Sequence, residues 1–198
     1  LFTLAPVDLT IRQGEILFIV GGNGSGKSTF LKLLTGLYYP TADGCIMLDD
    51  EIVTRENYQR YRELFSIIFT DFHMFKKLYG LESVDEREVR HLIREMDIHT
   101  KTDYTGGKFT HVNLSTGQRK RLAYIAALLE DKPIYVFDEW AADQDPQFRK
   151  HFYENLLEDL RAMNKTIIAV THDDRYFDRA DRVIKMDEGA IKSIRRTS

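Results

Sequence analysis

A glycine-rich segment near the start of the chain carries residue types suited to binding phosphate. The segment matches the phosphate-loop pattern G-x-x-x-x-G-K-[ST] and contains Gly21, Gly22, Asn23, Gly24, Ser25, Gly26, Lys27, Ser28 and Thr29. Glycines let the backbone wrap closely around an anion and aim its N–H groups at it. Lys27 would reach the β- and γ-phosphates, and Ser28 would offer a hydroxyl to Mg²⁺, which prefers oxygen ligands. The segment predicts a site for ATP and Mg²⁺.

The residues on either side of this loop fit the same interpretation. Residues 16–20 are a continuous apolar run, typical of a central strand covered on both faces. Residues 28–37 place apolar side chains on one side of a predicted helix. The positive end of that helix dipole would face the bound anion. A glycine-rich turn that only joins a strand to a helix is the alternative, and this setting makes it the weaker one.

Two adjacent carboxylates follow a second buried run, residues 134–137. Open α/β sheets bind ligands at the carboxyl ends of their strands, where Asp138 and Glu139 are expected to emerge. A phosphate-loop enzyme needs an acidic site for Mg²⁺ and for the attacking water. We assign Asp138 to the magnesium side, through water, and Glu139 to the role of general base. A pair of surface acids after a strand is the alternative reading.

The rest of the chain alternates predicted strands and helices. Further strands are expected at 7–11, 64–69, 166–171 and 182–186, a hairpin at 45–53, and helices at 118–129 and 148–163. This order predicts an α/β fold with a mainly parallel, doubly wound sheet and an antiparallel β-subdomain. A charge-rich helical block at 75–101 and a polar loop at 102–111 interrupt it. We therefore expect a core of residues 1–70 and 129–198 and an inserted helical subdomain at 71–128.

The composition narrows the class of protein. The chain has 198 residues, 43% of them apolar and 30% charged, which is ordinary for one globular domain. Its net charge of −3 gives no basic surplus, so we expect no nucleic-acid partner. Cys45 is a single cysteine and allows no internal disulfide. No stretch reaches the ~18 apolar residues that span a bilayer. The first residue is not Met, so we expect a fragment whose upstream transmembrane domain is missing.

One further motif narrows the prediction from a nucleotide-binding domain in general to one family. The segment 114–118, Leu-Ser-Thr-Gly-Gln, resembles the signature motif of ATP-binding cassette (ABC) ATPases, usually Leu-Ser-Gly-Gly-Gln. Thr116 replaces the first glycine and leaves Ser115, Gly117 and Gln118 in place. By itself, the segment could be a plain N-capping Ser-Thr. The resemblance implies a second copy of the domain, facing the first head to tail, so that Ser115 and Gly117 of one complete the ATP site of the other.

The resemblance extends to other positions and has two departures. Asp145 matches the D-loop aspartate, and His172 matches the H-loop histidine, which in the family contacts the γ-phosphate. Thr70 stands where the family has the Q-loop glutamine; it can still offer an oxygen, so we place it on the metal side. The aromatic residue that stacks on adenine in the family lies further upstream than this chain begins, and Phe2 is a weak substitute.

Five stretches resemble one branch of the family, the bacterial exporters of cyclic peptides and peptide siderophores of the syringomycin and pyoverdine type; they are residues 18–27, 69–75, 114–123, 138–146 and 171–177. In that branch a membrane domain precedes the ATPase on the same chain. The resemblance implies an ATP hydrolase at the cytoplasmic face of the bacterial inner membrane, which contacts the transporter's transmembrane domain around residues 72–79. A soluble ABC ATPase of DNA repair or translation and a non-catalytic ABC-type regulatory module are the alternatives. The absent basic surplus disfavours the first, and intact Lys27, Glu139 and His172 disfavour the second.

Overall fold

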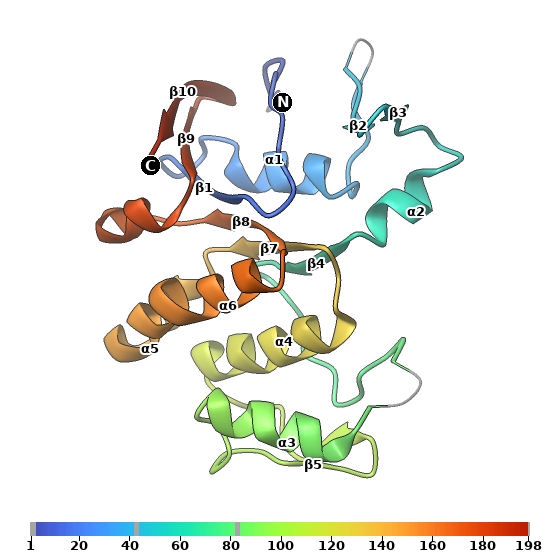
Figure 1. Ribbon diagram of the computed structural model, residues 1–198, viewed down its shortest axis with the longest axis vertical. Coiled ribbons are helices and arrows are strands. Elements are labelled where there is room, and N and C mark those ends of the chain that lie inside the picture. Colours follow the sequence, from blue (N-terminus) through green and yellow to red (C-terminus); the bar gives the residue numbers. More distant parts are fainter. Residues whose placement is uncertain (1–2, 42–43, 82–83, 198) are drawn as a thin grey trace.

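A six-stranded sheet forms the centre of the computed structural model, which describes residues 3–41, 44–81 and 84–197. The strand order is β10-β9-β1-β8-β7-β4 (Figure 1). These strands are β1 (Ile16–Val20), β4 (Phe65–Ile68), β7 (Ile134–Asp138), β8 (Thr166–Val170), β9 (Arg182–Asp187) and β10 (Ala190–Arg196). All neighbouring pairs are parallel except β10 with β9. The predicted α/β class with a mainly parallel sheet is confirmed.

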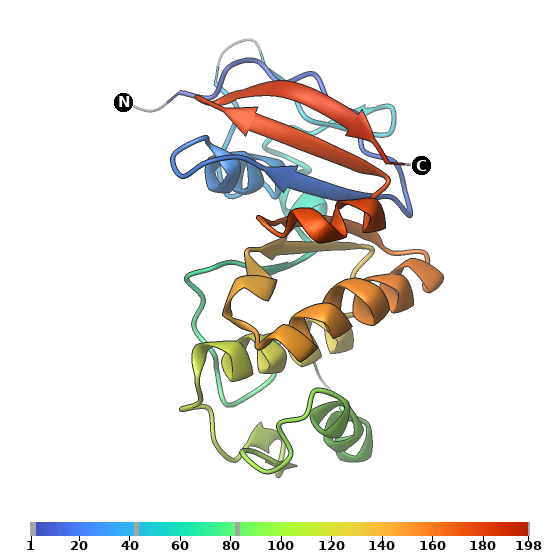
Figure 2. The ribbon, with the colours of Figure 1, turned by 90° about the vertical axis from the view of Figure 1, so that its left-hand side faces the viewer.

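Helices cover both faces of this sheet (Figures 1 and 2). On one face lies α1 (Lys27–Leu34), and on the other lie α4 (Thr116–Glu130) and α6 (Leu157–Ala162). A π-helical turn, Phe152–Leu156, joins α6 to α5 (Pro146–His151). At the end of the molecule furthest from β10, α3 (Glu86–Glu95) packs beside α4.

The central strand β1 sends its side chains into two separate cores. Leu17 and Ile19 pack with Phe30 of α1, whereas Ile16 and Phe18 pack with the helices on the other face. Alternate residues of a strand point to opposite faces, so a continuous apolar run is what a doubly covered strand requires. The continuous run at 16–20 therefore identified a strand that is central in the sheet.

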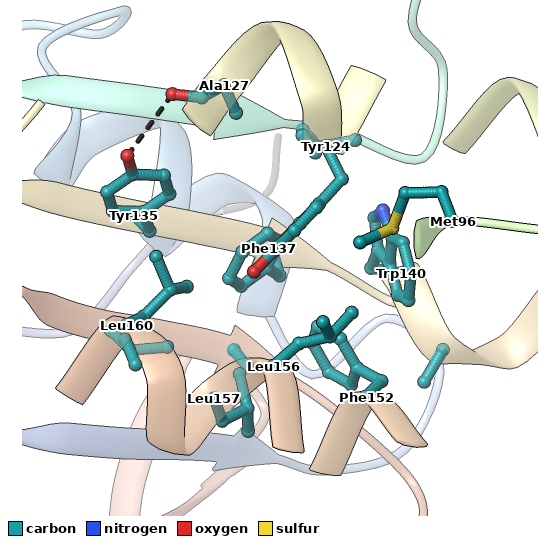
Figure 3. Close-up of a cluster of buried hydrophobic side chains, with 14 of the residues drawn as sticks. Met96, Tyr124, Ala127, Tyr135, Phe137, Trp140, Phe152, Leu156, Leu157 and Leu160 are labelled. Atoms are coloured by element: carbon teal, nitrogen blue, oxygen red, sulfur yellow. Dashed lines mark hydrogen bonds between the residues drawn. The ribbon is translucent and has the colours of Figure 1, made fainter. Parts of the chain in front are cut away.

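Aromatic rings dominate the core beneath β7 (Figure 3). Trp140 is 1% exposed and stacks on Phe152 with ring centroids 4.5 Å apart. Phe137, the residue of β7 that directly precedes the two carboxylates, packs edge to face on Phe152 with ring centroids 5.3 Å apart. Such pairs add to the apolar area that the rings bury. The chain is thus anchored on both sides of Asp138 and Glu139.

The predicted strand at 7–11 is wrong. These residues are extended, and Val7, Leu9 and Ile11 are half-buried in the alternation that the sequence predicts, but they join no sheet. Only scattered bonds tie the segment down, such as the one from the Arg182 guanidinium to the Thr10 carbonyl. Alternation reports which side of a segment is covered, not whether a neighbouring strand completes its hydrogen bonds.

The block at 75–101 is less helical than predicted. Among the residues of this block that the structure describes, 75–81 and 84–101, only α3 forms, with Asp85 accepting a hydrogen bond from the Arg87 N–H as N-cap. The predicted polar loop at 102–111 instead contains a small hairpin of β5 (Tyr104–Thr105) and β6 (Lys108–Phe109). Its two turn residues are glycines with φ of 58° and 73°, as a tight hairpin turn requires. The high content of charged residues therefore did not show which residues between 75 and 111 form a helix and which form turns.

Smaller differences lie at the ends of elements. The helix predicted to reach Leu37 stops at Leu34, because Gly36 has φ of +72°, and Leu37 is 44% exposed. The predicted hairpin at 45–53 forms with short strands, β2 (Met47–Leu48) and β3 (Glu51–Ile52), and α2 (Tyr58–Arg62) follows it. The edge strand β10 was not predicted. Phe2 lies outside the described residues. No helix in the described ranges is long and apolar enough to cross a bilayer.

Candidate nucleotide-binding and hydrolysis site

The glycine-rich loop connects β1 to α1 as predicted, and glycine is required at two of its positions. A Cβ on Gly21 would lie 2.3 Å from the Met186 carbonyl oxygen, so a larger residue would collide with β9. Gly26 has φ of 100° at the first position before α1, a conformation that favours glycine. The loop therefore leads the chain tightly from strand to helix and leaves the helix N-terminus open to an anion.

The loop residues surround a cavity. A hollow of about 270 Å³ is lined by residues 23–29 and by Glu139. The Lys27 ammonium lies 2.9 Å from the Gly21 carbonyl oxygen and 3.0 Å from that of Gly22, and donates to both. Lys27 is 6% exposed, so its charge is held against the loop. The hollow combines the positive end of a helix with a fixed cation, which suits phosphate oxygens.

Oxygen atoms from three segments meet beside the loop. The Ser28 hydroxyl lies 3.5 Å from a carboxylate oxygen of Asp138, at the end of β7. The Thr70 hydroxyl donates to the Asp138 backbone carbonyl at 3.1 Å. Burial, and then the charge of neighbouring Glu139, raise the pKa of Asp138, while hydrogen bonds from Thr70 and Ser28 oppose the shift. The structure thus brings together the three residues assigned to the metal side.

Glu139 occupies a strained turn immediately after β7. Its backbone is left-handed, with φ of 50° and ψ of 37°, and its N–H donates to the Val170 carbonyl at 3.2 Å. Its carboxylate lies 3.1 Å from Nε2 of His172, which follows β8. Non-glycine residues in this region store strain and cluster at functional sites. The turn directs a half-exposed carboxylate into the cavity and beside an exposed imidazole.

The signature residues lie away from this cavity in the same chain. Ser115 and Gln118 form a capping box at the start of α4, each side chain bonding the other's backbone N–H. A Cβ on Gly117 would lie 2.5 Å from the Asp143 carbonyl oxygen, so α4 approaches the turn after β7 very closely. Asp145 caps α5 by accepting from the Phe148 N–H. The structure places these four residues together, but not on the phosphate loop.

The sequence analysis missed the buried basic side chains that bond to the turn after β7, residues 139–145. Lys120 and Arg121 follow the signature segment on α4, and both are buried. The Arg121 guanidinium donates to Asp145 at 2.6 Å and to the Gln144 amide oxygen at 2.9 Å. Arg149 donates to three backbone carbonyls of the same turn, among them that of Ala142 at 3.0 Å. Basic residues on the apolar face of a predicted helix were the available signal.

Tyr153 supports the histidine segment in a similar way. Its hydroxyl bonds the Thr171 hydroxyl at 2.6 Å and donates to the Asp173 carboxylate at 3.0 Å. Both partners flank His172, and Tyr153 lies in the π-helical turn between α5 and α6. Such turns are frequent at functional sites. No pattern in the sequence predicts this contact, since a π turn has no residue signature.

Comparison with known proteins identifies the family. The family model described as ABC transporter matches residues 4–142. The chain belongs to the ABC transporter family. It is 49% identical over 198 residues to the ATP-binding protein SyrD of Pseudomonas syringae pv. syringae, covering 97% of this chain and 34% of SyrD. It is 34% identical to the energy-coupling factor transporter ATP-binding protein EcfA1 of Mycoplasma genitalium, covering 95% and 71%. This ABC domain spans about a third of the length of SyrD.

Solved structures agree on the fold. The chain matches a dimeric, post-hydrolysis structure of the ATP-binding cassette MJ0796 bound to ADP and Pi with a TM-score of 0.79 at 24% identity, covering 98% of this chain and 90% of that one. It matches cbiO1 from Clostridium perfringens, part of the ABC transporter complex cbiONQ, with a TM-score of 0.77 at 28% identity, covering 98% and 82%. The family match and the identity to SyrD make this chain an ATP-binding and ATP-hydrolysing domain of the ABC transporter family, as predicted, and the soluble alternative is not favoured.

Proposed function

We propose that this ABC domain powers the export of a cyclic peptide or peptide siderophore across the bacterial inner membrane, from its cytoplasmic face. The 49% identity to SyrD over 97% of the chain carries this proposal. The macrolide export protein MacB 1/2 of Paracoccus denitrificans, 30% identical over 98% of the chain, is a second relative with export in its name. Several motif stretches also resemble exporters of that chemical class.

The site geometry supports a division of roles in hydrolysis. The phosphate loop and Lys27 hold the triphosphate, since the cavity that they line combines a helix N-terminus with the Lys27 ammonium. Glu139 accepts a proton from the water that attacks the γ-phosphorus, and the bond to the bridging oxygen breaks to release ADP. His172, within hydrogen-bonding distance of Glu139, orients that carboxylate and contacts the γ-phosphate.

The metal side has the donor set that Mg²⁺ prefers. Ser28 and Asp138 offer oxygen atoms 3.5 Å apart, and Thr70 adds a hydroxyl beside them. Among the described residues no group of three or more His, Cys, Asp and Glu side chains is placed to hold a metal without other ligands. Bound Mg²⁺ would offset the negative charge of the phosphates. Ser28 and Asp138 would hold it, with Thr70 nearby.

We propose that two copies of the domain enclose the nucleotides. Ser115, Gly117, Gln118 and Asp145 lie together outside the cavity of their own chain, so they are free to complete the site of a second copy. The helix N-terminus that Ser115 caps is suited to a γ-phosphate. The MJ0796 cassette, which has the same fold, was solved as a dimer. Binding of ATP would close the pair, and release of phosphate would open it.

We propose that residues 71–128 form a helical subdomain and that the transporter's transmembrane domain, upstream of this chain, docks beside it. A groove of about 310 Å³ lies there, between α4 and the segment that follows β4. Phe75 and Tyr79 line it and are 55% and 70% exposed. Their rings lie edge to face with centroids 5.5 Å apart, and contiguous exposed apolar surface marks an interaction site. Docking at this groove would carry the closure of the ATP site to the membrane helices.

Transport in vesicles tests the export proposal. Inverted membrane vesicles that contain the full-length protein should accumulate a cyclic peptide when ATP is supplied. Vesicles with the Glu139→Gln variant at equal abundance should not. Equal accumulation by both proteins, or none by the wild type while its ATPase activity is normal, would overturn export of this class of substrate.

A further inference from the structure

Lys120 has no exposed surface, although lysine is almost never fully buried without a partner. It lies on α4, two residues after the signature segment. Its ammonium lies 2.6 Å from the Glu139 carbonyl oxygen and 2.7 Å from a carboxylate oxygen of Asp143. Burying an ammonium is costly, and the cost is offset only where the geometry of its partners is good. Both partners here belong to one turn, the turn that presents Glu139.

Lys120 makes hydrogen bonds to both residues that flank the peptide bond after Glu139, namely Glu139 and Trp140. Its side chain bonds the Glu139 carbonyl, and its own backbone carbonyl accepts from the indole N–H of Trp140 at 3.0 Å. Glu139 has the left-handed backbone described above, which L-residues adopt at a cost. A cation on the carbonyl of that residue favours the strained conformation over a relaxed one, because relaxing the turn would leave the buried ammonium short of a partner.

We propose that Lys120 is a positioning residue for hydrolysis: it fixes the turn at Glu139 and so holds the carboxylate at the position of the attacking water. Lys120 lies under the turn and does not line the nucleotide cavity, so it acts through Glu139 and not on the nucleotide itself. Without the Lys120 ammonium, the turn would relax and the Glu139 carboxylate would move away from the position of the attacking water. Misplacement of a catalytic group by about 1 Å costs on the order of 100-fold in rate.

The same contacts join the signature segment to the catalytic turn. The Gln144 amide donates to the Gly117 carbonyl at 3.1 Å, and a Cβ on Gly117 would meet the Asp143 carbonyl oxygen at 2.5 Å. The start of α4 and the turn that begins at Glu139 therefore move as one body. In the proposed dimer, on which this step rests, the start of α4 faces the partner's nucleotide. Lys120 would then transmit the state of that nucleotide to Glu139 of its own chain.

Lys120→Met tests the proposal, since it keeps the length and volume of the stem and removes the ammonium. In the full-length protein we expect kcat for ATP hydrolysis to fall roughly 10- to 100-fold. The Kd for ATP should stay within about twofold of the wild type, because the phosphate loop is untouched. A wild-type kcat, or a loss of ATP affinity as large as the loss of kcat, overturns the proposal.

The chain offers a matched control at the other end of the same helix. The Lys165 ammonium bonds the Asp131 carboxylate at 2.6 Å and points to its carbonyl oxygen at 3.4 Å, and Asp131 also has a left-handed backbone, with φ of 49°. Lys165→Met removes the same kind of contact from the C-terminal end of α4. It should leave kcat unchanged. An equal loss of kcat in both variants would show that Lys120 acts only through the stability of α4.

A double variant separates positioning from other effects. Because Lys120 acts through Glu139, Lys120→Met should not lower the residual rate of Glu139→Gln further. Losses that multiply would contradict the proposal. If Lys120→Met does not fold, Lys120→Gln replaces it; the shorter amide donor should give a smaller loss of kcat, with the same independence of ATP affinity. A wild-type kcat in Lys120→Met overturns the positioning role and leaves the proposed function standing, whereas ATPase activity without peptide transport counts against the proposed function alone, so the two failures are distinguishable.

Discussion

At the scale of single residues, the carboxylate of Glu139 has the most demanding surroundings in the site. Three segments contact Glu139: the Val170 carbonyl accepts a hydrogen bond from its backbone N–H, the Lys120 ammonium donates to its backbone carbonyl, and His172 contacts its carboxylate. Only the last contact uses the carboxylate, which leaves its second oxygen free to accept a proton. A general base needs such reach toward the cavity, and the turn provides it.

Glu139→Gln should block hydrolysis and leave nucleotide binding intact. Glutamine keeps the size and the hydrogen bond to His172 but takes up no proton, so kcat should fall roughly 10²- to 10⁴-fold. Steady-state phosphate release measures the effect, and light scattering with ATP should show a dimer that persists. Glu56→Gln, at an exposed glutamate, is the control and should behave as the wild type. A fully active Glu139→Gln would exclude the role of general base.

Lys27→Ala should abolish ATP binding. Its ammonium is the one cation of the loop, and it sits against the Gly21 and Gly22 carbonyls at the floor of the cavity. Isothermal titration calorimetry of the variant should show no heat of ATP binding at concentrations that saturate the wild type. Lys32→Ala, one turn further along the same helix, is the control. Undiminished affinity of the Lys27 variant would remove the lysine from phosphate binding.

At the scale of elements, an ion pair joins the starts of two neighbouring strands, since Glu15 directly precedes β1 and Arg182 is the first residue of β9. Arg182, the first residue of β9, donates to the carboxylate of Glu15 and to the Thr10 carbonyl. Burial alone would raise the pKa of Glu15, but the bonds from Arg182 and from the Arg12 N–H outweigh it, so its pKa lies below the ordinary value. The ionised carboxylate therefore stabilises the fold.

Glu15→Gln should lower stability in a pH-dependent way. Because the folded pKa is depressed, the contribution of Glu15 is fully present above its ordinary pKa of about 4.3 and is lost as the pH falls through the folded value. We expect the variant to lose roughly 2 kcal/mol of unfolding free energy at pH 7, from weakened bonds to a charged partner. Urea denaturation at pH 7 and pH 4 checks this. A difference between variant and wild type that grows toward low pH would contradict the sign.

Elements differed in how far the sequence determined them. Continuous apolar runs identified β1, β7 and β8, because a strand covered on both faces needs no other signal. The segment 7–11 has the alternation of a strand but pairs with no other strand, and the hairpin at 104–109 lies where a polar loop was predicted. For 7–11 the outcome depended on which segment lies alongside, and a local pattern carries no information about that. For the hairpin the local signal was present, since Gly106 and Gly107 form the two-residue turn that joins its strands.

At the scale of the whole molecule, the residues that we assign to the nucleotide site lie in two separate places. The phosphate loop and Glu139 line the cavity. Ser115 and Gly117 lie outside it at the start of α4, which a hydrogen bond from Gln144 joins to the turn after β7. An isolated chain in this arrangement would bind ATP and hydrolyse it poorly, because the proposed second copy supplies the missing half. Dimerisation and hydrolysis should therefore respond together to changes at the start of α4.

Ser115→Asp tests that arrangement without weakening the fold. Aspartate caps a helix as well as serine does and suits the helix dipole, so the thermal midpoint should be unchanged or higher. Its negative charge would oppose the partner's γ-phosphate, so the Glu139→Gln background should no longer dimerise with ATP while each chain still binds it. Light scattering and calorimetry measure the two effects. Ser115→Asn, a neutral cap, is the control; loss of dimers with both substitutions would not support charge repulsion.

The sequence by itself determined the chemistry of the phosphate loop at 21–29 and the carboxylates after residue 137, since both depend on residue types in a fixed local order. It also determined the mainly parallel sheet, through its apolar runs. Only the tertiary structure decided the left-handed turn at Glu139, the burial of Lys120 beneath it and the separation of Ser115 from the cavity. Each of these arises where segments far apart in the chain meet, and their mutual distances are fixed by packing and by the pairing of buried charges, which no local pattern encodes.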